Sequence, residues 1–161
     1  MRRNLLTLAG ILVLLACTHQ SYAQTLFTLG PYVGYDTEFE DALAGAQLRL
    51  GGGLFPLIFQ PGVEFDLNGF DYVRGEANAL FPIGGPFTLV FTPYVGAGVA
   101  GTFATEGGGD TIWGANLLGG VSFKIIGTGL NPFIQARYTV EKGTDPLAVM
   151  GGLLFRFGGP L

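Results

Sequence analysis

The sequence has little of what most catalytic and metal sites are built from. It holds one cysteine, Cys17, and one histidine, His19, and both precede Ala23, in a segment that we expect to be removed. Beyond that point serine occurs once, at Ser122. Serine–histidine and cysteine–histidine catalysis, disulfides, and thiol or imidazole metal sites are therefore excluded from the remaining chain. We expect no enzyme activity, no cofactor and no metal centre.

Charged residues are also scarce, at 12% of 161 residues, which is about half the proportion in ordinary soluble domains. The formal net charge is −4, and the absence of a basic patch excludes nucleic-acid binding. The sequence instead has 28 glycines, 14 phenylalanines and 48% hydrophobic residues. This composition disfavours helices and favours strands, and the length suits one domain.

The N-terminal segment has the pattern of a signal peptide. Arg2 and Arg3 precede an apolar run over residues 5–16, and Ser21-Tyr22-Ala23 offers small residues at a signal-peptidase site. The run is too short for a bilayer span, which needs about 20 residues. We therefore predict residues 1–23 as a signal peptide cut after Ala23, and residues 24–161 as the mature domain.

The stretch Leu14-Leu15-Ala16-Cys17 offers an alternative, because it resembles a bacterial lipobox in which Cys17 would be lipidated. Both alternatives export the protein. Cleavage after Ala23 leaves six basic residues against twelve acidic ones, a net charge of −6.

From Thr25 onward, apolar residues alternate with small or polar ones in stretches of about ten residues, as in β-strands. In residues 87–103, for example, Phe, Leu and Val occupy one face, while Thr, Tyr, Gly and Ala occupy the other. Eight strands are predicted, over residues 26–35, 42–53, 58–67, 75–83, 87–103, 112–125, 131–141 and 147–157. Tight turns with Gly or Pro alternate with longer loops that hold most of the carboxylates.

The two faces of these strands indicate a membrane environment. A soluble sandwich would crowd its outer faces with Lys, Glu and Asp, whereas here the bulky faces are apolar and the other faces are small or sparsely charged. Hydrocarbon requires every backbone hydrogen bond to be satisfied, which a closed barrel achieves. We predict an all-β fold, an eight-stranded antiparallel up-and-down transmembrane β-barrel. Aromatic girdles are expected from Phe81, Phe87, Phe123 and Phe157 at one end and from Tyr35, Phe103, Trp113 and Tyr138 at the other.

Charged residues on the polar faces are expected to point into the lumen. The interior of an eight-stranded barrel is just wide enough for side chains, and an unpaired buried charge costs several kcal/mol. We therefore predict a salt-bridge network that plugs the lumen, centred on Arg49, Glu64, Glu76 and Arg137, with Glu141 as a weaker candidate near a loop. The alternative is that some of the charged residues lie near the rims in water and pair with nothing. The predicted interior residues are Arg49, Glu64, Asp66, Glu76, Lys124, Arg137 and Arg156.

Two other motifs point to no site. Residues 96–101 match the G-x-G-x-x-G fingerprint, but the fingerprint requires a helix to start there and bind pyrophosphate, and the following residues are not helical. Asp36, Glu38, Glu40 and Asp41 cluster without EF-hand spacing. We expect a solvated acidic loop that divalent cations bridge loosely to lipopolysaccharide.

The signal peptide and the stretches TPYVGAGVAG, NPFIQARYTV and LLFRF resemble the small eight-stranded outer-membrane β-barrels of Gram-negative bacteria. This group includes OmpA-like, opacity-type and OmpW-like barrels, and the resemblance covers residues 25–157. It implies a location in the outer membrane, with membrane lipid, lipopolysaccharide and the barrel-assembly machinery as partners. Members commonly end on an aromatic residue that this machinery recognises. Phe157 would take that part here, although residues 158–161 follow it.

Three functions are compatible with the sequence. The first is a monomeric, non-enzymatic protein with a plugged lumen and a structural or surface-interaction role. The second is a narrow channel for small or apolar solutes, which the OmpW-like resemblance allows and a glycine-rich inner face would accommodate (Gly96, Gly98, Gly114, Gly120 and Gly152). The third is an exported lipoprotein with a lipocalin-like barrel anchored through Cys17.

Overall fold

Alternating side chains over nine to fourteen residues produce eight strands. The computed structural model describes residues 26–38, 40–51, 57–84, 90–105 and 111–157. The signal peptide, Cys17, Ala23, Phe87 and residues 158–161 lie outside them. The strands are β1 Leu26–Asp36, β2 Asp41–Gly51, β3 Ile58–Asp66, β4 Tyr72–Pro82, β5 Phe91–Ala104, β6 Ile112–Phe123, β7 Leu130–Glu141 and β8 Leu147–Phe157.

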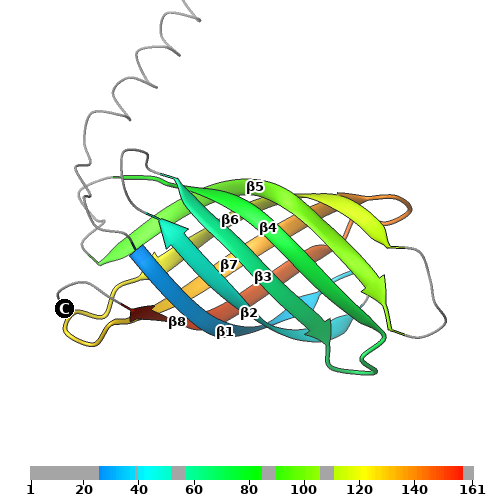
Figure 1. Cartoon of the computed structure of the whole chain (residues 1–161), viewed down its shortest axis with the longest axis horizontal. Coiled ribbons are helices and arrows are strands. Elements are labelled where there is room, and N and C mark those ends of the chain that lie inside the picture. The colour runs from blue at the N-terminus through cyan, green and yellow to red at the C-terminus, as the bar shows by residue number, and fades with distance from the viewer. Residues whose placement is uncertain (1–25, 39, 52–56, 85–89, 106–110, 158–161) are drawn as a thin grey trace, which may run out of the picture.

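The strands form one closed antiparallel barrel, as Figure 1 shows. Each strand pairs with the next, and β8 returns to pair with β1, so that Phe27 lies opposite Phe157. Pro31 is accommodated within β1 and has Ala46 as its partner on β2, while it and Gly30 have no register partner on β8. Closure pairs the backbone N–H and C=O groups that the edge strands of an open sheet would leave exposed. The predicted eight-stranded antiparallel barrel is confirmed.

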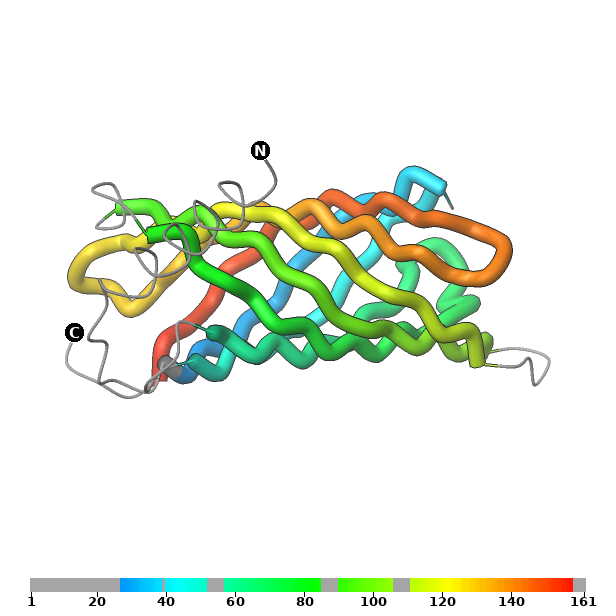
Figure 2. Tube along the Cα trace, turned by 90° about the horizontal axis from the view of Figure 1, so that it is seen from above, coloured from blue at the N-terminus to red at the C-terminus, as the bar shows by residue number. Residues whose placement is uncertain are grey.

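The strands run between two ends of the barrel, as Figure 2 shows. At one end, which we call the turn end, β1, β3, β5 and β7 begin and β2, β4, β6 and β8 end. At the other, the loop end, β1, β3, β5 and β7 end and β2, β4, β6 and β8 begin. No helix long and apolar enough to cross a membrane occurs within the described ranges.

The outer face of the barrel is apolar. Side chains such as Val33, Val99, Leu117 and Ile134 are exposed along the middle of their strands, and aromatic side chains are exposed near both ends. At the turn end these are Phe81, Phe123 and Phe157, and at the loop end Tyr35, Phe103, Trp113 and Tyr138. An apolar band flanked by aromatic girdles is the surface that lipid requires of a transmembrane barrel.

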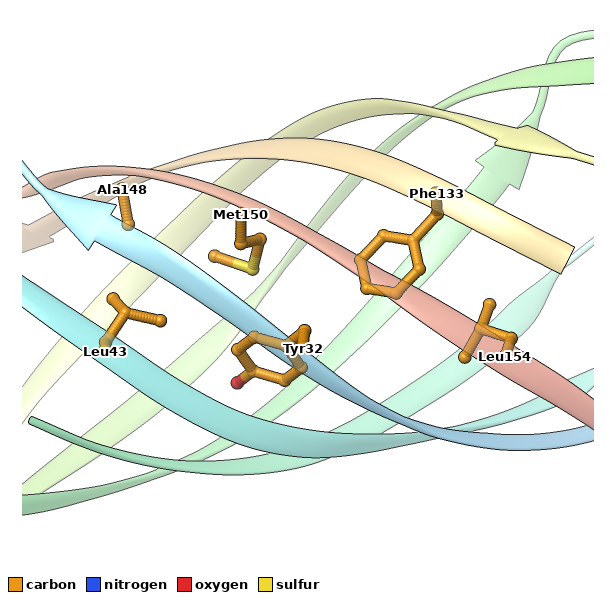
Figure 3. Packing of buried hydrophobic residues seen from close by; sticks show 6 residues of the cluster. All are labelled: Tyr32, Leu43, Phe133, Ala148, Met150 and Leu154. Carbon is orange, nitrogen blue, oxygen red and sulfur yellow. The ribbon is translucent and has the colours of Figure 1, made fainter. Parts of the chain in front are cut away.

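The inner face is less polar than the sequence pattern predicts. Figure 3 shows one apolar cluster inside the barrel, contributed by β1, β2, β7 and β8: Tyr32, Leu43, Phe133, Ala148, Met150 and Leu154. A second cluster joins Leu80, Tyr94 and Leu118, with Ile58 packed against it. Alternation decides these positions, because consecutive leucines such as Leu117 and Leu118 take opposite faces, the first exposed and the second buried.

Adjacent glycines on β6 give a direct test of the two faces. A Cβ atom at Gly120 would lie 2.5 Å from Tyr94 Oη and 2.6 Å from the Ile134 carbonyl oxygen, whereas one at Gly119 meets nothing within 4 Å. Gly120→Val should therefore lower the free energy of unfolding by about 1–3 kcal/mol through overpacking. The matched variant Gly119→Val should be nearly neutral. Urea unfolding of the refolded barrel in micelles measures both variants, and equal effects would contradict this assignment of faces.

Candidate functional site

An ion-pair cluster crosses the lumen in the middle of the barrel. Arg137 on β7 donates through Nη2 to Glu64 Oε1 at 2.5 Å and through Nη1 to Glu64 Oε2 at 2.8 Å. The same Nη1 donates to Glu76 Oε2 at 2.9 Å. All three side chains are fully buried. Since β3, β4 and β7 are not all neighbours, these contacts tie one wall of the barrel to another through the lumen.

Arg74 and Glu141 extend the cluster toward the loop end. Arg74 Nη1 lies 3.6 Å from Glu64 Oε1, its Nη2 lies 3.3 Å from Glu141 Oε1, and its Nε donates to Thr102 Oγ1 at 2.9 Å. Arg74 was missed at the sequence level because residues before 75 were assigned to a loop, whereas β4 begins at Tyr72. Arg74 lies two positions before Glu76, and this spacing is the sequence signal that puts both side chains on the inner face.

Neutral side chains add hydrogen bonds to this cluster. Tyr32 Oη donates to Glu64 Oε2 at 3.0 Å. Asn116 Nδ2 donates to Glu76 Oε2 at 3.4 Å and to Asn78 Oδ1 at 2.9 Å. These contacts satisfy part of the hydrogen-bonding capacity of the two buried carboxylates, which an ion pair taken out of water requires. Arg137 Nε and Glu76 Oε1 have no hydrogen-bond partner among the described residues.

A second polar layer lies nearer the turn end. Gln60 donates through Nε2 to Gln47 and, at 3.3 Å, to Gln135 Oε1, which also accepts from Tyr94 Oη at 3.0 Å. Arg49 donates to Tyr94 Oη at 2.8 Å and to Ser122 Oγ at 2.7 Å. This layer consists of amides, hydroxyls and one cation.

The predicted interior residues thus divide into two groups. Glu64, Glu76 and Arg137 come together in the ion-pair cluster. The other four form no ion pair with any described residue. Those four are Arg49, Asp66, Lys124 and Arg156. The prediction that Arg49 pairs with a carboxylate in this network is therefore wrong, whereas the three others follow the alternative in which some charged residues stay outside it.

The reasons differ among these four residues. Arg49 is buried, but its partners are Ser122, Tyr94 and Gln135. Asp66 ends β3, and its carboxylate accepts from two backbone amides, at 3.0 Å from Gly69 N in the β3–β4 connection and at 3.1 Å from Tyr72 N at the start of β4. Lys124 is exposed directly after β6, and Arg156 is partly exposed at the turn end. Alternation assigned a face to each residue but not a height along the barrel axis.

The glycines on the inner face do not leave an open path, because neighbouring atoms occupy the space of the missing side chains. A Cβ atom at Gly98 would lie 2.2 Å from Asn78 Oδ1, and one at Gly152 would lie 2.8 Å from Phe133 Cε1. Gly96 and Gly114 are similarly enclosed, by Leu80 and Thr139. Small residues therefore make room for larger side chains on adjacent strands.

Among the described residues, no group of three or more His, Cys, Asp or Glu side chains is arranged to hold a metal ion. The inner polar residues form salt bridges and hydrogen bonds with one another. This arrangement fixes the positions of the eight strands and fills the space between them.

Solved structures of other proteins have a similar fold. The N-terminal β-barrel domain of Pseudomonas aeruginosa OprF superposes with a TM-score of 0.63 at 15% identity, over 83% of this chain and 100% of that one. The fold is that of the small outer-membrane barrels. Neisserial surface protein A (NspA) matches with a TM-score of 0.59 at 14% identity, over 86% of this chain and all of that one.

The Yersinia pestis outer membrane protein Ail also matches, with a TM-score of 0.53 at 11% identity, over 83% of this chain and 100% of that chain. No protein-family model and no curated protein sequence matches this chain. At these identities the likeness concerns the fold, and the role of the chain has to be argued from its own residues.

Proposed function

We propose that this chain is a non-enzymatic outer-membrane β-barrel of a Gram-negative bacterium, with a closed lumen and a structural or surface-interaction role. The observation that carries the proposal is the ion-pair cluster of Arg74, Arg137, Glu64 and Glu76, which joins opposite walls across the lumen. A lumen filled at this level leaves the lipid-facing wall and the loop end as the working surfaces.

The outer surface supports the membrane location. Its exposed apolar side chains and two aromatic girdles are what lipid and its interfaces accommodate. The similar barrels include one named a surface protein and one named an outer membrane protein. Export through cleavage after Ala23, assembly by the barrel-assembly machinery and a monomeric state complete the proposal.

The loop end supports a surface role. Exposed carboxylates gather there, with Glu38 and Glu40 between β1 and β2 and Asp71 between β3 and β4. In transmembrane barrels the longer loops face the outside of the cell and the short turns face the periplasm. We propose that the acidic loop end meets lipopolysaccharide through bridging divalent cations.

A narrow channel for small solutes is the competing function, and the enclosed inner glycines argue against it. We expect the full chain, refolded and added to planar lipid bilayers, to give no steady single-channel current. Heat-modifiable migration on a denaturing gel verifies that the added protein is folded, and a general porin verifies the bilayer. Steady single-channel conductance from the folded protein would overturn the closed-lumen proposal.

A different measurement distinguishes cleavage after Ala23 from the lipoprotein alternative. Mass spectrometry of the mature N-terminus should find unmodified Gln24 as the first residue if the signal peptide is cut after Ala23. A lipidated Cys17 would instead support an anchored protein.

A further inference from the structure

A cavity of about 120 Å³ lies inside the turn end of the barrel. Three of the basic residues described above line it: Arg49 from β2, Lys124 after β6 and Arg156 from β8. No acidic residue is among its lining residues. The cations of the mid-barrel cluster have carboxylate partners, whereas Arg49, Lys124 and Arg156 form no ion pair with any residue that the structure describes.

Arg49 is a buried cation of this cavity that forms no ion pair with a described residue. Its side chain is 3% exposed, and its guanidinium lies 4.6 Å from the Tyr94 ring centre and 4.9 Å from that of Phe133. Hydroxyl and amide groups accept from its terminal nitrogens, but Nε has no hydrogen-bond partner. A buried guanidinium is normally matched by a carboxylate or phosphate with which it forms charge-assisted hydrogen bonds.

Two further groups at the same cavity lack partners. Thr28 Oγ1 and Arg156 Nε are buried without any hydrogen bond, and Thr28 and Arg156 lie opposite each other on β1 and β8. Together with Arg49 Nε, these are three hydrogen-bond donors without a partner among the described residues, and all three belong to residues that line one cavity. A ligand with two acceptor oxygens in one plane suits guanidinium groups in particular.

The rest of the lining is mainly apolar. Ile58, Leu80 and Leu154 contribute hydrocarbon walls beside the cations. An apolar cavity of about 150 Å³ accommodates a benzene molecule. The present cavity is smaller but opens toward exposed Lys124, so a six-carbon body fits when part of the ligand extends into that opening. Inorganic anions would satisfy the cations but would leave this wall uncovered.

We propose that this cavity binds a small organic carboxylate with an apolar body of about the size of a benzene ring, which enters from the turn end. The carboxylate meets Arg49, Arg156 and Lys124, and the apolar body lies against Ile58, Leu80 and Leu154. This site goes beyond the proposed function and does not depend on whether the lumen conducts.

Isothermal titration calorimetry with benzoate as the probe tests the proposal on the full refolded chain in zwitterionic micelles. Titration into protein-free micelles measures partitioning. We expect saturable benzoate binding that benzyl alcohol and inorganic phosphate do not reproduce. Absence of saturable binding would overturn the proposal, and so would equal binding of phosphate, because the apolar wall would then contribute nothing.

Variants locate the binding at the cavity. Lys124 and Arg156 are at least partly exposed and form no ion pair with a described residue, so Lys124→Gln with Arg156→Gln should fold, as heat-modifiable migration verifies. The double variant should weaken benzoate binding at least about tenfold, since it removes charged hydrogen-bond donors. Lys142→Gln removes a lysine charge at the loop end and should leave the affinity unchanged. Equal affinity in the double variant would show that benzoate binds elsewhere.

Discussion

Replacing Arg137 with leucine is expected to lower the free energy of unfolding by about 3–5 kcal/mol, the typical result of removing one partner from a buried ion pair. Arg137 holds Glu64 at 2.5 and 2.8 Å and Glu76 at 2.9 Å, with all three side chains fully buried. Leucine would leave two buried carboxylates near each other without the cation between them. Urea unfolding of the refolded barrel, followed by the fluorescence of Trp113, measures the change.

Two further variants isolate the electrostatic cause. Adding Glu64→Gln to Arg137→Leu removes one of the stranded carboxylates, so the double variant should be more stable than the sum of the two single effects by about 1–3 kcal/mol. Arg156→Leu makes the same change at a partly exposed arginine with no ion pair to a described residue, and should cost less than about 1 kcal/mol. Similar losses for Arg137→Leu and Arg156→Leu would contradict the proposed role of the mid-barrel cluster.

The architecture could be predicted because period-two alternation carries it directly. Bulky apolar residues on one face of eight stretches, with small and polar residues on the other, leave a closed barrel in lipid as the arrangement that satisfies both faces. The structure corrects strand boundaries, most visibly at Tyr72, where β4 begins three residues earlier than expected. Strand ends are weakly encoded because alternation fades into the loops.

The interior network could be predicted only in part, because alternation says which way a side chain points and not which residues meet across the lumen. Glu64 and Arg137 come from β3 and β7, 73 positions apart, and meet because register and strand tilt bring them to one level. Arg49 carries the same pattern signal but lies at the turn end, where no carboxylate lines the cavity. Its partners are therefore hydroxyl and amide groups.

Replacing Leu117 with arginine tests the opposite face of the barrel. Leu117 lies in the middle of β6, is 58% exposed and sits between Ala97 and Tyr138 on the neighbouring strands. If this face contacts hydrocarbon, a guanidinium here should destabilise the inserted barrel by about 2–4 kcal/mol, the cost of arginine at the bilayer midplane. The variant is refolded into lipid vesicles, and unfolding with guanidinium chloride measures the decrease in the free energy of unfolding. In a Gram-negative host, less of the variant should reach the outer-membrane fraction.

The depth dependence of the cost distinguishes lipid from any other environment. Leu147 is exposed on the same outer face but begins β8 at the loop end, so Leu147→Arg should cost only about 0–1 kcal/mol, as expected near an interface. Leu117→Phe keeps the position apolar and should be nearly neutral. A soluble barrel would tolerate arginine at both positions, because water solvates an exposed guanidinium wherever it lies. If Leu117→Arg inserts normally while Arg137→Leu is tolerated, the assignment of faces is inverted and the membrane location fails with it.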